Sequence, residues 1–263
     1  MATVVVTGAT GAIGSAAVAA LEKRRAQVIA LSRPTFDLSS MTSVRAAARE
    51  LNRSRSHIDA LLNIAAVYVP RYRKSADGLE LMLAVNHLGP FLLTNLLRDN
   101  LTGGGRVITV TAPSTTRVDV DKLLDRDEFG AFHSFGATKA ANLMFTFELA
   151  RRAKRWDVRA NAFYPGMVKS KLMRESPRVL RLVTRLIART PNRTGEDLAE
   201  LALPPRTPAR QDGSSRGHAG STHRNQPWTP TSRPPCGNGA RSWSSWKAAS
   251  KSGGEAQSST PRS

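Results

Sequence analysis

Apolar and polar positions follow two different periods over the first 203 residues of the chain. Short apolar runs rich in β-branched residues predict strands, and longer stretches with apolar positions three or four apart predict helices. The expected strands are Thr3–Val6, Gln27–Leu31, Ile58–Ala66, Gly105–Thr111 and Asp157–Phe163. The expected helices are Ile13–Arg25, Met41–Leu51 and Ser134–Arg152. Strands that alternate with helices are typical of βαβ units, so we predict an α/β fold with a parallel sheet.

A glycine-rich turn joins the first strand to the first helix. The segment Thr7–Gly14 reads Thr-Gly-Ala-Thr-Gly-Ala-Ile-Gly. Glycine allows a sharp turn and lets the backbone approach a pyrophosphate, while the start of the helix supplies unpaired N–H groups and a partial positive charge. Glycines at this spacing also occur in ordinary strand-to-helix turns. Because a strand precedes the turn and a small-residue helix follows it, we interpret it as a phosphate cradle.

Two motifs resemble the short-chain dehydrogenase/reductase (SDR) family. The first is the TGxxGxxG pattern of the glycine-rich turn. The second lies between Asp77 and Leu97 and includes Val85–Pro90, which is similar to the retinol-dehydrogenase-like branch of the family. The resemblance implies a Rossmann-type, doubly wound parallel sheet in three α/β/α layers. It also implies hydride transfer between a nicotinamide cofactor and a small-molecule carbonyl or alcohol. The apolar and basic region Pro177–Arg189 favours a lipophilic substrate, with an anionic one as the alternative.

Four positions match the catalytic residues of the family, and two of them carry a different residue. Asn86 matches the asparagine that holds a water in the proton relay, and Lys139 matches the lysine that lowers the pKa of the catalytic phenol. Phe135 stands at the position of the catalytic tyrosine, and Ala112 at that of the serine that polarises the substrate carbonyl. Since neither side chain has a hydroxyl, we expect proton transfer to be severely impaired.

Polar residues close to these positions leave a rescue of the lost chemistry open. Ser114 lies two residues after Ala112 and replaces the serine only if its loop is re-registered. His133 and Ser134 directly precede the phenylalanine in sequence. His87, by contrast, belongs to the motif as a packing residue, because it has no carboxylate partner nearby in sequence.

The residue after the second strand indicates which nicotinamide cofactor is bound. Arg33 follows the second strand, where an acidic residue binds the ribose of NAD and an arginine accommodates the 2′-phosphate of NADP. We therefore expect NADP(H) rather than NAD(H), with a solvated loop arginine as the alternative. Together with the glycine-rich turn, the resemblance to the family implies the following cofactor-binding residues: Gly8, Thr10, Gly11, Ala12, Ile13, Gly14, Ser32, Arg33, Asp37, Leu38, Asn63, Ala65, Lys139, Pro165, Gly166, Val168 and Ser170.

Two segments depart from a simple repeat of strand and helix. Only three residues, 34–36, separate Arg33 from Asp37-Leu38, which resembles the Asp-Leu after the third strand of the family. Because a parallel crossover needs a dozen or more residues, we expect the third strand to be curtailed. Pro177–Arg189 carries arginines at helical spacing. We interpret it as a substrate lid with a basic solvated side, and an anionic membrane surface is the alternative.

The composition changes at Pro204. From there to Ser263 the chain has no Leu, Ile, Val, Met, Phe or Tyr, and Ser, Pro and Gly make up 27 of the 60 residues. Such a segment cannot bury enough apolar surface to offset its ordering entropy. We therefore predict a Rossmann domain at 1–203 and a disordered basic tail at 204–263, with the last strand of the fold missing. A shifted reading frame explains this composition, and so does a genuine disordered tail.

Charge, cysteine content and hydropathy restrict the partners. The net charge is +19, but no RNA-binding motif or zinc-finger spacing is present, so we expect no specific nucleic acid and no metal. Cys236 is the only cysteine, which excludes an internal disulfide. No run reaches the roughly 18 apolar residues of a membrane span, and no signal segment is recognised, so we expect a cytoplasmic protein. The resemblance implies a homodimer, although the altered C-terminus removes one of the family's contacts.

Three functions stay open at this point. The first is an SDR oxidoreductase with weak or rerouted activity. The second is a module that binds NADP(H) without turnover, as a sensor or scaffold. The third is a truncated gene product that does not fold stably.

Overall fold

The structure is a computed structural model that describes residues 1–166, 168 and 190–203. The chain divides into two units, Met1–Ser221 and Thr222–Ser263, and every described residue belongs to the first. The predicted lid, the candidate residue Ser170 and the predicted tail lie outside the described residues.

The centre of the first unit is a sheet of five parallel strands in the order β2-β1-β3-β4-β5. The strands are β1 (Thr3–Thr7), β2 (Gln27–Leu31), β3 (Ala60–Asn63), β4 (Arg106–Val110) and β5 (Arg159–Phe163). Thr7 pairs with Leu31 on one side and with Asn63 on the other, so the strands end at a common edge, called here the carboxyl edge. The predicted parallel α/β sheet is confirmed.

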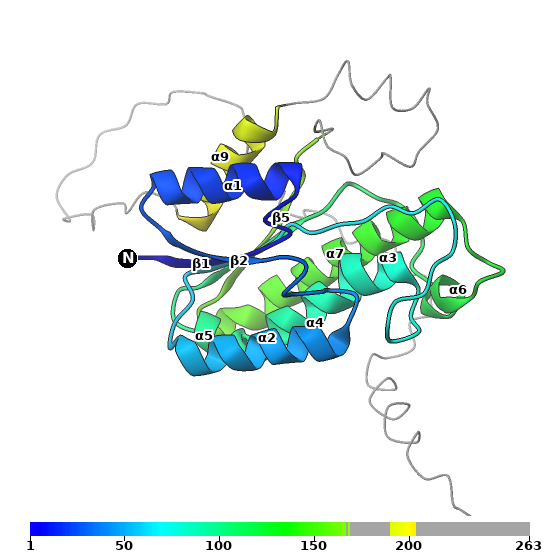
Figure 1. Ribbon diagram of the computed structural model, residues 1–263, viewed down its shortest axis with the longest axis horizontal. Helices are drawn as coiled ribbons and strands as arrows, with labels where there is room; N and C mark the ends of the chain where they lie inside the picture. Colours follow the sequence, from blue (N-terminus) through cyan, green and yellow to red (C-terminus); the bar gives the residue numbers. More distant parts are fainter. Residues whose placement is uncertain (167, 169–189, 204–263) are drawn as a thin grey trace, which may run out of the picture. The chain divides into compact units, whose positions relative to one another are not determined.

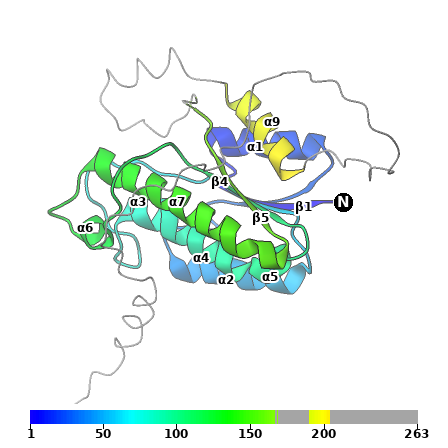
Figure 2. The ribbon, with the colours of Figure 1, turned by 180° about the vertical axis from the view of Figure 1, so that it is seen from behind.

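Helices cover both faces of the sheet and complete three layers (Figure 1). One face carries α1 (Ala12–Lys23) and α9 (Pro191–Ala202), and the view from behind in Figure 2 shows the same pair together. The other face carries α2 (Met41–Ser54), α4 (Gly89–Leu96), α5 (Arg98–Leu101) and α7 (Ala131–Ala153). The shorter elements are α3 (Leu81–Leu83), η1 (Ala84–Leu88), α6 (Val120–Leu124) and η2 (Lys154–Trp156).

Alternation along the strands divides the core between the two faces. Val4 and Val6 of β1 are buried with Leu21 of α1 and Leu198 of α9, whereas Val5 is buried on the opposite face. Helix α1 is rich in alanine and α9 contributes a glycine, so their backbones approach closely at Ala16 and Gly195. Burial on both faces explains why these strands are continuous apolar runs rather than alternating ones.

Helix α2 begins where its sequence provides a cap. The Ser40 hydroxyl oxygen accepts a hydrogen bond from the amide of Ser43, and Val44, Ala48 and Leu51 form the buried stripe at helical spacing. Between β2 and this helix the described chain forms turns and no strand. Strand β2 is therefore an edge of the sheet, as the short connection predicts.

Strand β3 is shorter than predicted. The amides of Ile64 and Ala65 donate to the Thr7 hydroxyl, at 3.1 and 3.4 Å, instead of to a strand carbonyl. This side-chain acceptor ends the ladder after Asn63, although the apolar run continues. Strand β5 likewise begins later than predicted, because Asp157 takes a left-handed conformation with φ of 52°.

Candidate cofactor and catalytic site

The candidate site lies where the strand order reverses. From β1 the chain moves to β2 on one side and later to β3 on the other, so the crevice at the carboxyl ends of β1 and β3 is the topological switch point. Open α/β sheets bind ligands at such a crevice. The walls are close together here, since a Cβ on Gly8 would lie 2.8 Å from the Cα of Ala65.

The glycine-rich turn has the geometry of a phosphate cradle. Gly8 has φ of +70° and its amide donates to the carbonyl of Leu31 at 3.0 Å. A Cβ on Gly14 would overlap the Gly8 carbonyl. Helix α1 starts at Ala12, and its N-cap residue Gly11 provides no side-chain cap; the first turn has no acidic residue. The first amides of α1 are therefore unoccupied by side chains, and the turn fits a dinucleotide pyrophosphate.

The end of β3 supplies a second wall of polar groups. Asn63 is 3% exposed, and its side-chain Nδ2 donates to the Thr94 hydroxyl at 3.1 Å. Its Oδ1 is buried and has no hydrogen-bond partner among the described residues. Ala65 packs against the cradle as described above. The predicted pair of Asn63 and Ala65 therefore lies beside the glycine-rich turn.

The loop after β2 holds the residues predicted to contact the adenosine. The carbonyl of Ser32 accepts from the amide of Phe36 at 3.1 Å, which closes a turn and leaves Arg33 exposed at its tip. The Asp37 carboxylate accepts from the amide of Ser39 at 2.8 Å. Leu38 is buried in the core, so only its backbone remains for a ligand.

Asn86 lies in the π-helical turn η1, which packs against helix α7. Its side chain exchanges two hydrogen bonds with the backbone of Val67, at 2.7 and 3.0 Å, and its Nδ2 also donates to Thr138 at 3.3 Å. Its carbonyl accepts from Asn142 of α7 at 2.8 Å. Single π turns recur at functional sites. This one fixes Asn86 between the loop after β3 and the candidate catalytic helix.

Helix α7 brings Phe135 and Lys139 together. The Lys139 Nζ lies 5.4 Å from the centre of the Phe135 ring and 3.5 Å from the Val110 carbonyl. Burial lowers the pKa of Lys139 to about 8, because the charged ammonium is removed from water. The Thr111 hydroxyl donates to the Lys139 carbonyl at 2.8 Å and ties the helix to the end of β4.

Ser114, His133 and Ser134, the candidate replacements for the missing hydroxyls, differ in burial and in hydrogen bonding. Ser114 lies beside the start of α7, but its hydroxyl donates to the carbonyl of Gly136 at 2.9 Å. His133 is exposed, whereas Ser134 is 2% exposed. Strand β4 ends at Val110, one residue earlier than the sequence predicts, and Ala112 lies two residues after that end. The Ser114 hydroxyl is thus already engaged with the backbone of α7.

The turn after β5 carries the predicted nicotinamide-side residues. Tyr164 is 53% exposed, Pro165 is buried and Gly166 has φ of +71°, which suits a tight turn. Val168 is partly buried. Lys139 approaches this side of the sheet through its contact with Val110, which pairs with Phe163 at the end of β5.

Sequence reasoning missed an aromatic cluster next to the catalytic helix. The ring of Tyr68 lies 5.8 Å from that of Phe135, edge to face, and 5.4 Å from that of Phe132. The sequence signal is the apolar segment Val67–Val69, which continues past the end of β3. Phe135 thus packs in an apolar wall, a setting that suits a phenyl ring.

His87 is a packing residue in the structure. It is 3% exposed, its Nδ1 lies 2.9 Å from the Asn142 Oδ1, and burial lowers its pKa. Among the described residues, no group of three or more His, Cys, Asp or Glu could hold a metal ion. No helix within the described part of the chain is long and apolar enough to cross a membrane.

Comparison with known proteins identifies the family. The model of the short chain dehydrogenase family matches residues 34–179, more than half of the chain. The protein therefore belongs to the short-chain dehydrogenase family, whose members bind NAD(P) and act on small molecules. Within that family it falls in the retinol-dehydrogenase-like branch.

Individual relatives support this assignment over part of their length. Human retinol dehydrogenase 14 is 36% identical over 143 residues, which cover 53% of this chain and 43% of that protein. Human retinol dehydrogenase 11 is 34% identical over 200 residues, which cover 66% and 63%. The chain thus spans about half the length of these relatives. The 3-alpha-hydroxysteroid dehydrogenase from Pseudomonas sp. B-0831, in complex with NADH, shares the fold with a TM-score of 0.65 at 21% identity, over 77% of this chain and 90% of that one.

Proposed function

We propose that the protein binds NADP(H) on a short-chain dehydrogenase scaffold and that its hydride exchange with a lipophilic carbonyl or alcohol is impaired. The observation that carries the proposal is the pairing of Phe135 with Lys139. The lysine keeps the position that would serve a phenol, and the ring beside it has no proton to transfer. Asn86, the glycine-rich turn and the parallel sheet are retained around this pair, whereas Ala112 lacks the hydroxyl of the family's serine.

Cofactor binding rests on the chain's own groups at the switch point. The amides at the start of α1 would hold the pyrophosphate, and Gly8 and Gly14 leave the space that a Cβ would fill. Arg33 is exposed after β2 and would bind a 2′-phosphate through charge-assisted hydrogen bonds. When bound, the nicotinamide supplies the hydride.

The expected decrease in the rate of the reaction follows from the loss of the proton donor. A positioned general acid contributes ~10²–10⁴ in rate, and an oxyanion donor such as the missing serine contributes a further ~10²–10³. Members of one relay are not additive, so the two factors do not simply multiply. The proposed activity is therefore lower than that of an intact site by at least the first factor.

A binding module without turnover is the second candidate. The observation that favours it is the Ser114 hydroxyl, which donates to the Gly136 carbonyl and so offers no free proton toward Phe135. A third candidate, a chain that lacks its last strand and does not fold stably, predicts no cofactor binding at all. We further propose a cytoplasmic protein with a domain ending at Leu203, and a homodimer as its assembly.

Cofactor titration tests the proposal. We expect NADPH to bind the full chain about 10-fold or more tighter than NADH, since one hydrogen bond to a charged group is worth ~1.5–3 kcal/mol. Gly14→Val should abolish binding of both, because its side chain would overlap the Gly8 carbonyl. Following NADPH absorbance after adding ketones then separates weak turnover from none. If neither NADPH nor NADH bound to the chain, the proposal would be refuted.

A further inference from the structure

The edge of the sheet opposite the cradle, where the strands begin, is strongly basic. Arg106 starts β4 and Arg159 starts β5, and their Cα atoms are register partners. Like charges on directly paired strand positions are unfavourable. Burial lowers the pKa of Arg106, and the charge of Arg159 lowers it further. Two like charges therefore occupy paired positions on neighbouring strands, and no ion pair within the described residues compensates either of them.

Two segments of nine residues gather the positive charge. Residues 98–106 and 151–159 together contain six arginines, one lysine and two aspartates. Backbone hydrogen bonds join the segments, from Gly103 to the Trp156 carbonyl at 3.0 Å and from Gly104 to the Asp157 carbonyl at 2.7 Å. The basic residues are Arg98, Arg106, Arg151, Arg152, Lys154, Arg155 and Arg159. We call this set the basic edge.

Two carboxylates near the basic edge, those of Glu148 and Asp99, are already paired with its arginines. Hydrogen bonds from Arg151 and then Arg152 lower the pKa of Glu148 to about 2, and the Arg98 Nε lies 3.0 Å from the Asp99 carboxylate. Four members have no carboxylate partner within the described residues, namely Arg106, Lys154, Arg155 and Arg159. Positive charge at the basic edge is therefore in excess.

The surface is hollowed at this point. A cavity of about 350 Å³ is lined by Arg151, Arg152, Lys154 and Arg155, at the end of α7 and in η2. Favourable interaction with the helix dipole accounts for cations in the last turn of α7, but not for those on the strands. All four residues that line the cavity carry a positive charge, so the cavity favours an anion.

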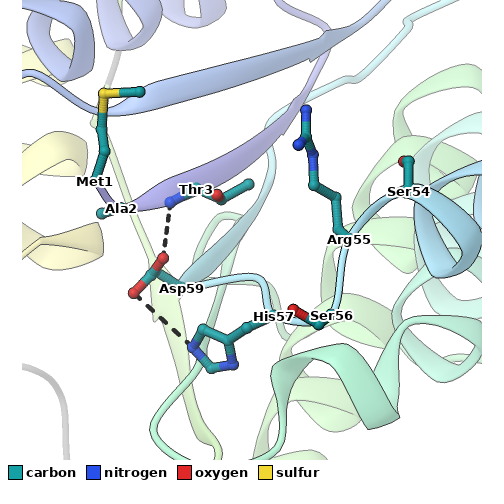
Figure 3. A pocket seen from close by; sticks show the side chains of 8 residues that line it. All are labelled: Met1, Ala2, Thr3, Ser54, Arg55, Ser56, His57 and Asp59. Atoms are coloured by element: carbon teal, nitrogen blue, oxygen red, sulfur yellow. Dashed lines mark hydrogen bonds and ion pairs between the residues drawn. The ribbon is translucent and has the colours of Figure 1, made fainter.

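A second hollow on the same edge has a different character. It measures about 490 Å³ and lies between the start of β1 and the end of α2 (Figure 3). The Asp59 carboxylate accepts from the Thr3 amide at 2.7 Å and lies 3.9 Å from the His57 Nε2. A carboxylate in its wall makes this hollow a poor anion site, so the basic edge is the stronger candidate.

We propose that the cavity of the basic edge binds a compact anion that carries two or more phosphate groups. Arginine predominates over lysine, as suits bidentate contacts with phosphate oxygens. No large apolar side chain in the two segments is among the exposed ones of the described chain, which argues against a membrane surface. The Trp156 ring already contacts two members of the basic edge, with the Arg98 guanidinium 5.2 Å and that of Arg155 4.5 Å from the ring centre, and the two segments hold no second aromatic residue on which successive nucleic-acid bases could stack.

Calorimetric titration of the full chain with inorganic tripolyphosphate tests the site. The test variant is the pair Lys154→Ser with Arg155→Ser, both exposed and both lining the cavity, and the matched control is Arg45→Ser with Arg49→Ser, exposed on α2. Both pairs remove two positive charges. We expect the test pair to weaken tripolyphosphate binding about 10-fold or more and the control pair to change it little.

Several outcomes would overturn the proposal, independently of the cofactor. Tripolyphosphate binding that the test pair leaves intact would assign the anion to another place, such as the cradle. If both pairs weakened tripolyphosphate binding equally, the loss would be explained by the lower net charge of the protein and not by a site. Binding only to a single-stranded oligonucleotide or to vesicles of anionic lipid, with no tripolyphosphate binding, would show that the occupant is a larger polyanion. Thermal unfolding of both pairs verifies that each variant is folded.

Discussion

Lys139 directs its ammonium toward the ring of Phe135, which lies four positions earlier on α7, with the Nζ 5.4 Å from the ring centre. A cation over an aromatic ring is attracted by the ring's negative face, so the lysine is held in place without a hydroxyl. The same ring cannot accept or release a proton. The structure therefore retains the position of the lysine but lacks the phenol that would transfer the proton.

Replacing Lys139 with methionine should stabilise the fold at neutral pH. The pKa of about 8, against 10.5 for the free side chain, means that burying the ammonium costs about 3 kcal/mol at pH 7. Some of this is recovered by the Phe135 contact, so we expect Lys139→Met to raise the free energy of unfolding by ~1–3 kcal/mol. Urea denaturation at pH 7 measures it, with Lys154→Met as an exposed control.

The pH dependence of that difference has a definite sign. The folded-state pKa is lower than the unfolded one, so between about pH 8 and pH 10.5 the unfolded state binds the extra proton and the stability of the native sequence rises with pH. The advantage of Lys139→Met should therefore shrink as pH increases through this window. A difference that stays constant from pH 7 to pH 10 would contradict burial of a charged lysine.

Substitution of Gly8 should be far more costly than substitution of Gly78. Both have positive φ, at +70° and +76°, so both alanine variants lose about 1–2 kcal/mol of backbone free energy. Only at Gly8 does the new Cβ meet the backbone of Ala65, at 2.8 Å, whereas nothing lies within 4 Å at Gly78. We expect Gly8→Ala to cost a further ~1–3 kcal/mol. Equal melting temperatures for the two variants would show that the crevice is not closed at this point.

Arg33→Gln tests the source of the cofactor preference. We expect NADPH affinity to fall ~10–100-fold and NADH affinity to stay unchanged, because only NADPH has a 2′-phosphate to contact the guanidinium. Arg45→Gln, at an exposed position on α2, is the control for net charge. Fluorescence titration of both cofactors provides the comparison. Equal loss of affinity for the two cofactors would assign Arg33 to the loop structure instead.

The parallel sheet and the cradle were predictable because their signals are local. The apolar run before Gly8 defines β1, and glycines at a fixed spacing define the turn whatever the rest of the chain does. Asn86, Phe135 and Lys139 were located through the family resemblance. The short connection after Arg33 correctly predicted that no strand follows β2 before α2 in the described chain.

Features that depend on side chains meeting across the fold were not predictable. The end of β3 is set by the Thr7 hydroxyl of another strand, which the apolar run up to Ala66 does not reveal. The engagement of Ser114 with the Gly136 carbonyl depends on how a loop packs on α7. The contact of Tyr68 with Phe135 joins positions 67 residues apart in sequence, where no periodic pattern applies.

The most direct test of the central claim compares NADPH oxidation by the native sequence with that by Phe135→Tyr combined with Ala112→Ser, using lipophilic aldehydes and ketones. Both proteins should bind NADPH equally, and the double variant should gain ~10²–10⁴ in turnover, because a general acid and a carbonyl-polarising hydroxyl are restored next to Lys139. A native protein that already turns over as fast as the double variant would contradict the claim, because some other group would then supply the proton that a tyrosine at position 135 would give.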